Sequence, residues 1–257
     1  MNILVLGDLI GENSVKRVKE ILPKAIKENN IDFVIANGEN SADGMGITSK
    51  IFKDLMCAGV NVVTMGNHTW GKKDIFNIIE NKNLLRPANY ARDVLGNGYG
   101  IYECNNKKIC VINLIGRVDM NVLSENPFIV VQDIINKIKD NTDIIIVDFH
   151  AEATAEKIAM GYFLDGKITC LYGTHTHVAT ADEAILENGT AYITDVGMSG
   201  PKKSVIGMDV DASIKRFVTT LPERYKTSAD SQIVCNGIIL NINDETCRAE
   251  KIRRIKL

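Results

Sequence analysis

Short runs of apolar, mostly β-branched residues recur along the first two thirds of the chain. Six of these runs are almost entirely apolar and do not alternate with polar residues: 3–6, 33–36, 62–65, 109–113, 144–147 and 168–172. This pattern is typical of strands that are buried on both faces, because neither face then needs polar side chains. We therefore expect these six runs to form strands of a largely parallel sheet.

Helical periodicity fills several of the intervals between the runs. Residues 14–28 follow a candidate cap at Asn13 or Ser14, and residues 49–58 follow Thr48 and end before Gly59. Residues 127–139 and 154–160 are two further predicted helices. Strands that alternate with helices indicate a layered α/β domain.

The last third of the chain changes character. Residues 191–194, 232–242 and 248–255 have strand patterns, and the last two predict a hairpin through 243–245. A second hairpin is predicted within 96–114, turning at Asn105 and Asn106. A mixed sheet or a pair of packed sheets would accommodate these strands. Because no repeat, low-complexity tract or linker interrupts the chain, we expect one domain over 1–257.

Composition narrows the class of protein. Of 257 residues, 45% are hydrophobic and 24% are charged, and the formal net charge is -2. The chain therefore lacks the excess of basic residues that would indicate bulk nucleic-acid binding. The six cysteines form no C-x-x-C pair, which favours buried reduced thiols over disulfides or a zinc site. The first residues carry no basic leader, and no run approaches the roughly 20 apolar residues of a membrane span. We expect a cytoplasmic protein with no membrane partner.

Polar side chains follow five of the predicted strands, at the edge where open α/β sheets bind ligands. Each of these strand ends supplies an imidazole, a carboxylate or a carboxamide, and all four histidines of the chain are included. The segments are Gly7-Asp8, Asn37-Gly38-Glu39-Asn40, Gly66-Asn67-His68, Asp148-Phe149-His150 and Gly173-Thr174-His175-Thr176-His177.

This mixture of side chains indicates a metal site. Oxygen donors combined with imidazoles suit iron, manganese or zinc, and the candidates are too many for one four-coordinate ion. If the segment is extended, His175 and His177 project to the same side and serve neighbouring ions. A single histidine at a strand end is more often structural, Asp8 fits a turn or helix cap, and Glu39 and Asn40 fit a loop. The placement of all four histidines at such ends favours the metal interpretation.

Several motifs resemble those of the metallophosphoesterase superfamily, namely "GNH" at 66–68 and "GTHTH" at 173–177. Two positions depart from the general pattern: Leu9-Ile10 follow Asp8 where a D-x-H histidine is usual, and "NGEN" at 37–40 replaces GDxxD. With these departures the chain resembles the YmdB-like family of bacterial 2',3'-cyclic nucleotide phosphodiesterases. The resemblance extends through "GDLIGENS", "NGENSADGMGIT", "DFHAEATAEK" and "AYITDVGMSGP".

The resemblance implies a calcineurin-like β-sandwich flanked by helices, with the metal site at the carboxyl ends of the strands. It implies two metal ions that share a water, and this water attacks phosphorus. The ligand types favour iron or manganese as these ions. It also implies a small cyclic nucleotide or an RNA 2',3'-cyclic end as substrate, and a homo-oligomer. The implied ligands are Asp8, Asn40 and His177 for the first ion and Asn67, His150 and His175 for the second, with Glu39 as the bridge and His68 as the proton donor.

Some alternatives stay open at the level of sequence. The same metal pair would suit a phosphomonoesterase, and a regulatory partner-binding protein with a vestigial site belongs to a different class. Asp148 either orients an imidazole or only ends a strand. Arg86 and Arg117 fit phosphate clamps or surface salt bridges, and Trp70 fits a base stack or core packing.

Overall fold

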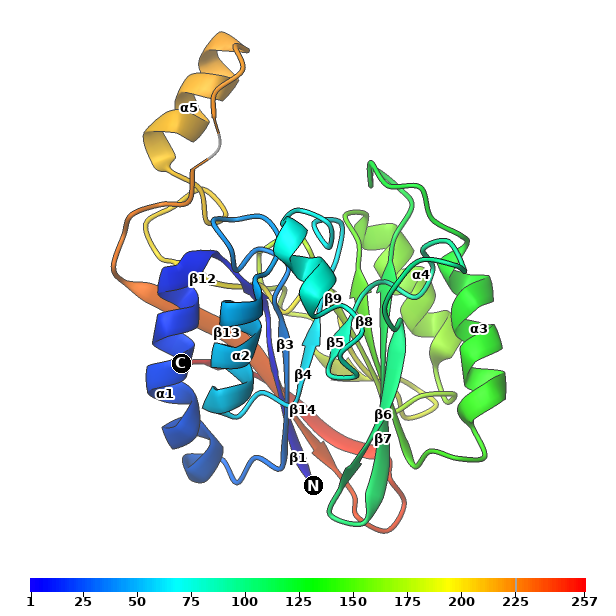
Figure 1. The fold of residues 1–257 in the computed structure, drawn as a ribbon. Coiled ribbons are helices and arrows are strands. Elements are labelled where there is room, and N and C mark those ends of the chain that lie inside the picture. The colour runs from blue at the N-terminus through cyan, green and yellow to red at the C-terminus, as the bar shows by residue number, and fades with distance from the viewer. Residues whose placement is uncertain (225) are drawn as a thin grey trace.

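Two β-sheets face each other in the centre of the molecule, and helices cover their outer faces (Figure 1). This computed structural model describes residues 1–224 and 226–257. Helices α1 (Gly11–Glu28) and α2 (Ser49–Ala58) lie on one side, and α3 (Pro127–Ile138) and α4 (Thr154–Leu164) lie on the other. The expected β-sandwich flanked by helices is confirmed, in the form of a pair of packed sheets.

The first sheet has the order β2-β12-β13-β1-β3-β4-β5, with β14 paired to β13. Strands β1, β3, β4 and β5 run parallel, whereas β13 is antiparallel to β1. The bounds are β1 (Asn2–Leu6), β2 (Asp8–Leu9), β3 (Phe33–Asn37), β4 (Val62–Thr64), β5 (Leu84–Leu85), β12 (Met198–Pro201), β13 (Ile233–Ile242) and β14 (Ala249–Lys256).

The second sheet has the order β10-β11-β9-β8-β7-β6. Its inner strands β11, β9, β8 and β7 run parallel, and its two edge strands are antiparallel to their neighbours. The bounds are β6 (Tyr99–Cys104), β7 (Lys107–Ile115), β8 (Ile144–His150), β9 (Cys170–Thr174), β10 (Ala184–Ile185) and β11 (Ala191–Ile193).

Each central strand is buried on both faces, which explains the almost entirely apolar runs. In β1, Ile3 packs into the core between the two sheets, and the next residue, Leu4, packs into the core beneath α1 and α2. In β8, Ile146 faces the inner core and Val147 faces the core beneath α3 and α4. The side chains alternate between two apolar layers, so most positions along these strands are apolar, and polar residues such as Asp148 of β8 occur toward the carboxyl ends.

The helix ends show where the sequence pattern was and was not sufficient. Helix α2 is confirmed with its cap, because the Thr48 side chain accepts from the amide of Ile51, and Gly59 ends the helix with φ +109°. Helix α1 starts at Gly11, so the cap expected at Asn13 or Ser14 is wrong; Ser14 lies inside the helix and its hydroxyl donates to the carbonyl of Ile10 at 2.5 Å. Helix α4 runs four residues beyond the predicted Met160, to Leu164.

Both predicted hairpins are confirmed. Strands β6 and β7 turn at Asn105 and Asn106, which have φ values of +49° and +59°, as this tight turn requires. Strands β13 and β14 form the second hairpin. Between β12 and β13 the chain leaves the sandwich and carries α5 (Val210–Thr219), which stands away from both sheets (Figure 1). Its Phe217 and Val218 side chains are largely exposed.

All six cysteines are free thiols, which agrees with the expectation of reduced cysteines. Burial was expected as well, and it holds fully for Cys110, Cys170 and Cys235. It is wrong for Cys57, which is exposed on α2. No helix within 1–224 and 226–257 combines the length and apolarity that crossing a bilayer would take.

Candidate metal centre

The carboxyl ends of the parallel strands in both sheets meet at one edge of the sandwich. Because the two sheets face each other, side chains that leave these strand ends converge from both sides. The structure brings all the predicted site residues together there: Asp8 in β2, Glu39 and Asn40 after β3, Asn67 and His68 after β4, His150 at the end of β8, and His175 and His177 after β9.

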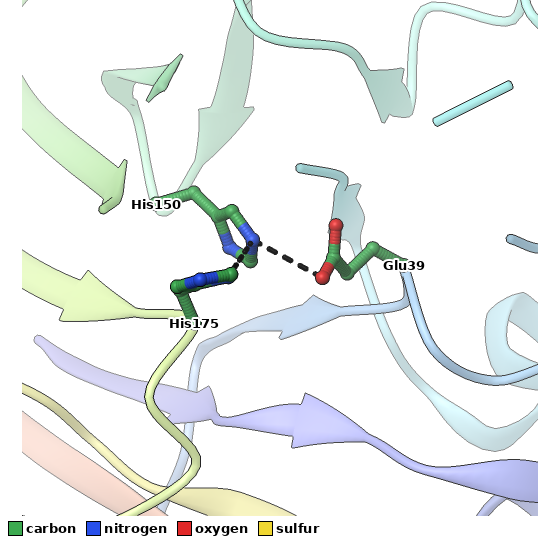
Figure 2. Close-up of side chains that lie close together, drawn as sticks. All are labelled: Glu39, His150 and His175. Carbon is green, nitrogen blue, oxygen red and sulfur yellow. Dashed lines mark hydrogen bonds and ion pairs between the residues drawn. The ribbon is translucent and has the colours of Figure 1, made fainter. Parts of the chain in front are cut away.

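His150 is the centre of a first group of donors (Figure 2). Its Nε2 lies 3.1 Å from Glu39 Oε1, 3.1 Å from His175 Nδ1 and 2.9 Å from Asn67 Oδ1. One donor atom each from Glu39, His150 and His175 lie within 4.8 Å of one another. Glu39 and His150 are fully buried, so water does not compete for these atoms.

A second group of donors also reaches Glu39 Oε1. His177 Nε2 is 3.1 Å from Asn40 Nδ2 and 3.9 Å from Asp8 Oδ1, and Asn40 Nδ2 is 3.0 Å from Glu39 Oε1. The Asn40 oxygen faces His68 Nδ1 at 2.8 Å. The two orientations of a carboxamide have nearly the same shape, so Asn40 can offer an ion its oxygen from the same position. Glu39 is the residue common to both groups.

Asp8 provides a direct test of whether cations fit. Its Oδ1 is buried and has no hydrogen-bond partner within the described part of the chain, while its Oδ2 accepts from the amide of His175 at 3.2 Å. A buried carboxylate oxygen without a partner is costly, and a cation among Asp8, Asn40 and His177 would satisfy it. Carboxylate, carboxamide and imidazole donors are also the types that iron, manganese and zinc accept. The residues present therefore fit metal ions.

Electrostatic coupling within the centre shifts three pKa values. Burial works to raise the pKa of Glu39, but His150 and His68 outweigh it and hold that pKa well below its usual range. Burial works to lower the pKa of His150, yet the Glu39 carboxylate raises it to about 9. Burial and the neighbouring His150 lower the pKa of His175 to about 3. Glu39 and His150 thus form an ion pair in the metal-free protein, and metal binding must displace the imidazolium proton.

A pocket of about 390 Å³ opens beside the centre. The candidate ligands form one wall, Met45, Ile206 and Met208 form another, and the carboxylates of Asp43 and Glu152 also line it. Together with Asp8 and Glu39, these carboxylates would repel a phosphate group. An anionic ligand can therefore be accommodated only when cations offset this charge.

A chain of hydrogen bonds fixes the imidazole of His150. Thr174 Oγ1 contacts His150 Nδ1 at 2.9 Å and donates to Asp148 Oδ1 at 2.7 Å, and Asp148 Oδ2 accepts from Thr64 at 2.5 Å. Of the two roles left open for Asp148, orienting an imidazole is the one that the contacts support, and it acts through Thr174. Sequence reasoning did not identify Thr174, because a lone threonine before a histidine carries no distinctive signal.

A buried ion pair stabilises the segment that carries His175 and His177. Lys157 Nζ contacts Asp195 Oδ2 and the carbonyl of Thr174, each at 2.8 Å, and both charged side chains are fully buried. Sequence reasoning did not identify this role of Lys157, because a lysine in a helix is ordinarily exposed.

The conformation of the histidine segment differs from the expected one. His175 and His177 have φ values of +94° and +66°, so the segment is not extended and strict alternation does not place its two imidazoles. These left-handed conformations instead direct His175 to His150 and His177 to Asp8 and Asn40. The condition of an extended segment is therefore not met, although each histidine still reaches a neighbouring group of donors.

The remaining candidates lie apart from the pocket. Arg86 is buried and donates to backbone carbonyls, including that of Pro87 at 2.8 Å, so its guanidinium serves the fold and does not clamp phosphate. Arg117 is exposed and is not among the described residues that line the pocket. Trp70 stacks on Phe76 with ring centroids 5.8 Å apart, at the surface and not in the core.

Comparisons with known proteins find relatives over nearly the whole chain. A family model described as YmdB-like protein matches residues 4–255. A 2',3'-cyclic-nucleotide 2'-phosphodiesterase of Bacillus subtilis (strain 168) is 46% identical over 256 residues, covering 99% of this chain and 96% of the relative. A Mycoplasma pneumoniae protein whose crystal structure is described as that of a novel phosphatase is 39% identical with a TM-score of 0.94, covering 100% of this chain and 93% of that one. A putative 5'-nucleotidase from Staphylococcus aureus, 14% identical, shares the fold alone, with a TM-score of 0.63 over 99% of this chain and 54% of its own.

Proposed function

The chain belongs to the YmdB-like family, and on that premise we propose that it is a metal-dependent phosphodiesterase that opens 2',3'-cyclic nucleotides to 3'-nucleotides. One observation carries the proposal: two groups of metal-ligand side chains meet at the shared carboxylate of Glu39, at the mouth of a pocket. The name of the Bacillus subtilis relative supports the choice of a cyclic nucleotide as substrate.

The assignment of ligands follows the two groups. Asp8, Asn40 and His177 would hold one ion, and Asn67, His150 and His175 would hold the other, with Glu39 between them. Two bound ions would supply positive charge for the phosphate and raise the acidity of a water that attacks phosphorus. Ligand types favour iron or manganese.

His68 is the proposed proton donor. The Nδ1 of His68 lies 2.8 Å from the Asn40 side chain, and the backbone amide of His68 donates to Glu39 Oε2 at 3.0 Å. The ring is thereby fixed at the edge of the centre, with Nε2 left for substrate. In the reaction, water oxygen bonds to phosphorus, the bond from phosphorus to O2' breaks, and O2' takes a proton from His68. General acid catalysis of this kind is typically worth 10²- to 10⁴-fold in rate.

Further properties follow as part of the same proposal. RNA that ends in a 2',3'-cyclic phosphate is a second substrate, because it presents the same ester. Six free thiols support a cytoplasmic location. The exposed apolar side chains of α5, Phe217 and Val218 among them, support a homo-oligomer, and residues 1–257 act as one catalytic domain.

The proposal is tested by product identity. The protein is stripped of metal, reloaded with manganese or iron, and incubated with 2',3'-cyclic AMP beside a metal-free control. Metal-dependent formation of 3'-AMP is expected, whereas adenosine would indicate a phosphomonoesterase. No turnover of any ester by the loaded protein would refute the enzyme and favour a regulatory role. A His68→Asn variant should retain its metal and lose most of its turnover.

A further inference from the structure

The pocket beside the centre has an apolar wall that the proposed chemistry does not use. It consists of Met45, Ile206 and Met208, called the methionine shelf below. Met45 and Ile206 leave 49% and 48% of their surface exposed. Apolar side chains gathered beside a few convergent polar groups are typical of a small-molecule pocket.

One half of the shelf is fixed by residues of the metal centre. Met45 lies on a tight loop in which Gly44 and Gly46 have φ values of +81° and +76°. The amide of Gly46 donates to the carbonyl of Glu39 at 2.5 Å, and the amide of Gly44 donates to the carbonyl of Asn40 at 3.1 Å. The loop therefore folds back onto two candidate ligands and places Met45 beside them.

The other half is fixed by a third candidate ligand. The carbonyl of Ile206 accepts from His177 Nδ1 at 2.8 Å, and Ile206 has a φ of +47°, which is strained for a β-branched residue. Met208 lies two residues further on, and its Cε is 3.2 Å from the position of a Cβ on Gly44, so the two halves meet. Strain of this kind persists only where the surroundings enforce it. The shelf is thus built together with the metal centre.

We infer that the methionine shelf binds the nucleobase of the substrate and accepts any of the four bases. The inference deepens the proposed function and rests on it. In a 2',3'-cyclic nucleotide the phosphate and the base are attached to the same ribose, so a phosphate at the centre carries the base to an adjoining wall. Thioethers pack well on aromatic rings, and a pocket of about 390 Å³ lies within the usual range for small ligands.

We expect the site to tolerate all four bases because the nearby polar side chains already have hydrogen-bond or ion-pair partners within the protein. A site rejects the wrong base strongly only when it aims buried polar groups at the edge of the right one. Apart from the candidate ligands and the proposed proton donor His68, the polar side chains that line the pocket already have partners: Asp43 contacts Lys72 at 3.1 Å, Glu152 contacts His175 at 3.1 Å, and Thr176 contacts Asp195 at 2.7 Å.

The test compares substrates with and without a base. KM and kcat are measured with manganese for the four 2',3'-cyclic nucleotides and for 1,4-anhydroribitol 2,3-cyclic phosphate, which has the ribose ring and the ester but no base. The variants are Met45→Ala and Met208→Ala, with Met45→Leu as the conservative change. Met56→Ala is the matched control, because Met56 is a half-buried methionine on α2 outside the described lining of the pocket. Calorimetry of 3'-AMP and inorganic phosphate binding adds a readout that does not depend on turnover.

Each alanine variant should raise KM for the cyclic nucleotides roughly two- to tenfold and weaken 3'-AMP binding to the same extent, with the base-free ester and phosphate unchanged. Met45→Leu and Met56→Ala should resemble the parent, and the four nucleotides should agree within about tenfold. Equal effects on both kinds of substrate, no effect on either, or a preference for one base above about a hundredfold would overturn the inference. If the parent turns over no ester, the proposed function fails, and the calorimetric comparison of 3'-AMP with phosphate still decides the shelf.

Discussion

Replacing Thr174 with valine isolates the hydrogen-bond chain behind His150. Valine keeps the shape of threonine and removes only the hydroxyl, which contacts Asp148 Oδ1 at 2.7 Å and His150 Nδ1 at 2.9 Å in a fully buried position. The imidazole then loses the group that fixes its rotation. Loss of such an outer contact typically weakens metal binding 10- to 100-fold, and we expect a loss within that range for Thr174→Val.

The same substitution should lower the free energy of unfolding. Each buried polar group left without a partner costs about 1 to 3 kcal/mol. Asp148 keeps its contacts with Thr64 and Asn37 through its other oxygen, so we expect a total loss of about 2 to 4 kcal/mol for the metal-free protein. Chemical denaturation without metal measures this loss separately from any effect on metal affinity.

The assay for metal is a competition titration of manganese against a chromogenic chelator. Thr190→Val is the matched control, because Thr190 is equally buried and its hydroxyl contacts the amide of Gly166 at 2.9 Å and the carbonyl of Ile168 at 2.8 Å, away from the centre. Thr174→Ser, which keeps the hydroxyl, should restore affinity. If Thr174→Val loses stability as Thr190→Val does but binds manganese like the parent, the hydroxyl is only structural and our reasoning is refuted.

Three further predictions concern the ion pairs and the metal. Lys157→Met should destabilise the protein by about 3 to 5 kcal/mol in urea unfolding, because it leaves the Asp195 carboxylate buried without its cation. Adding Asp195→Asn should recover part of the loss. Equal stability of the single variant and the parent would contradict this prediction. Burial works to raise the pKa of Asp182, but hydrogen bonds from Thr180 and Thr194 hold it below its usual range, so its contribution to stability is present above about pH 4 and is lost as pH falls through the folded-state pKa. Asp182→Asn should therefore flatten the acid limb of the stability curve, and an unchanged limb would count against it. Finally, saturating manganese should raise the melting temperature of the parent, and a chelator should reverse the rise and abolish turnover; a melting temperature that manganese leaves unmoved would argue against the centre.

The chain shows how far local patterns determine a layered α/β protein. Mostly apolar runs predicted the six central strands, because a strand buried on both faces has few polar positions. Thr48 and Gly59 marked the ends of α2 through local hydrogen bonding and backbone conformation. The start of α1 was misplaced, because Asn13 and Ser14 are good caps in isolation but lie within the helix. The chain just before the helix is instead held by tertiary hydrogen bonds, from the amide of Ile10 to the carbonyl of Ser199 and from the amide of Gly11 to the carbonyl of Asn40.

The sequence by itself determined which residues supply the donors of the candidate centre, because polar side chains at the carboxyl ends of parallel strands have one edge in common. Only the tertiary structure decided how they group: the left-handed conformations of His175 and His177, and the convergence of two sheets on Glu39, depend on contacts between segments far apart in the chain. The buried support from Lys157 and the shelf at Met45 depend on such contacts too, and no local pattern encodes them. Composition and periodicity describe what each segment prefers, whereas a pocket exists only where several segments meet.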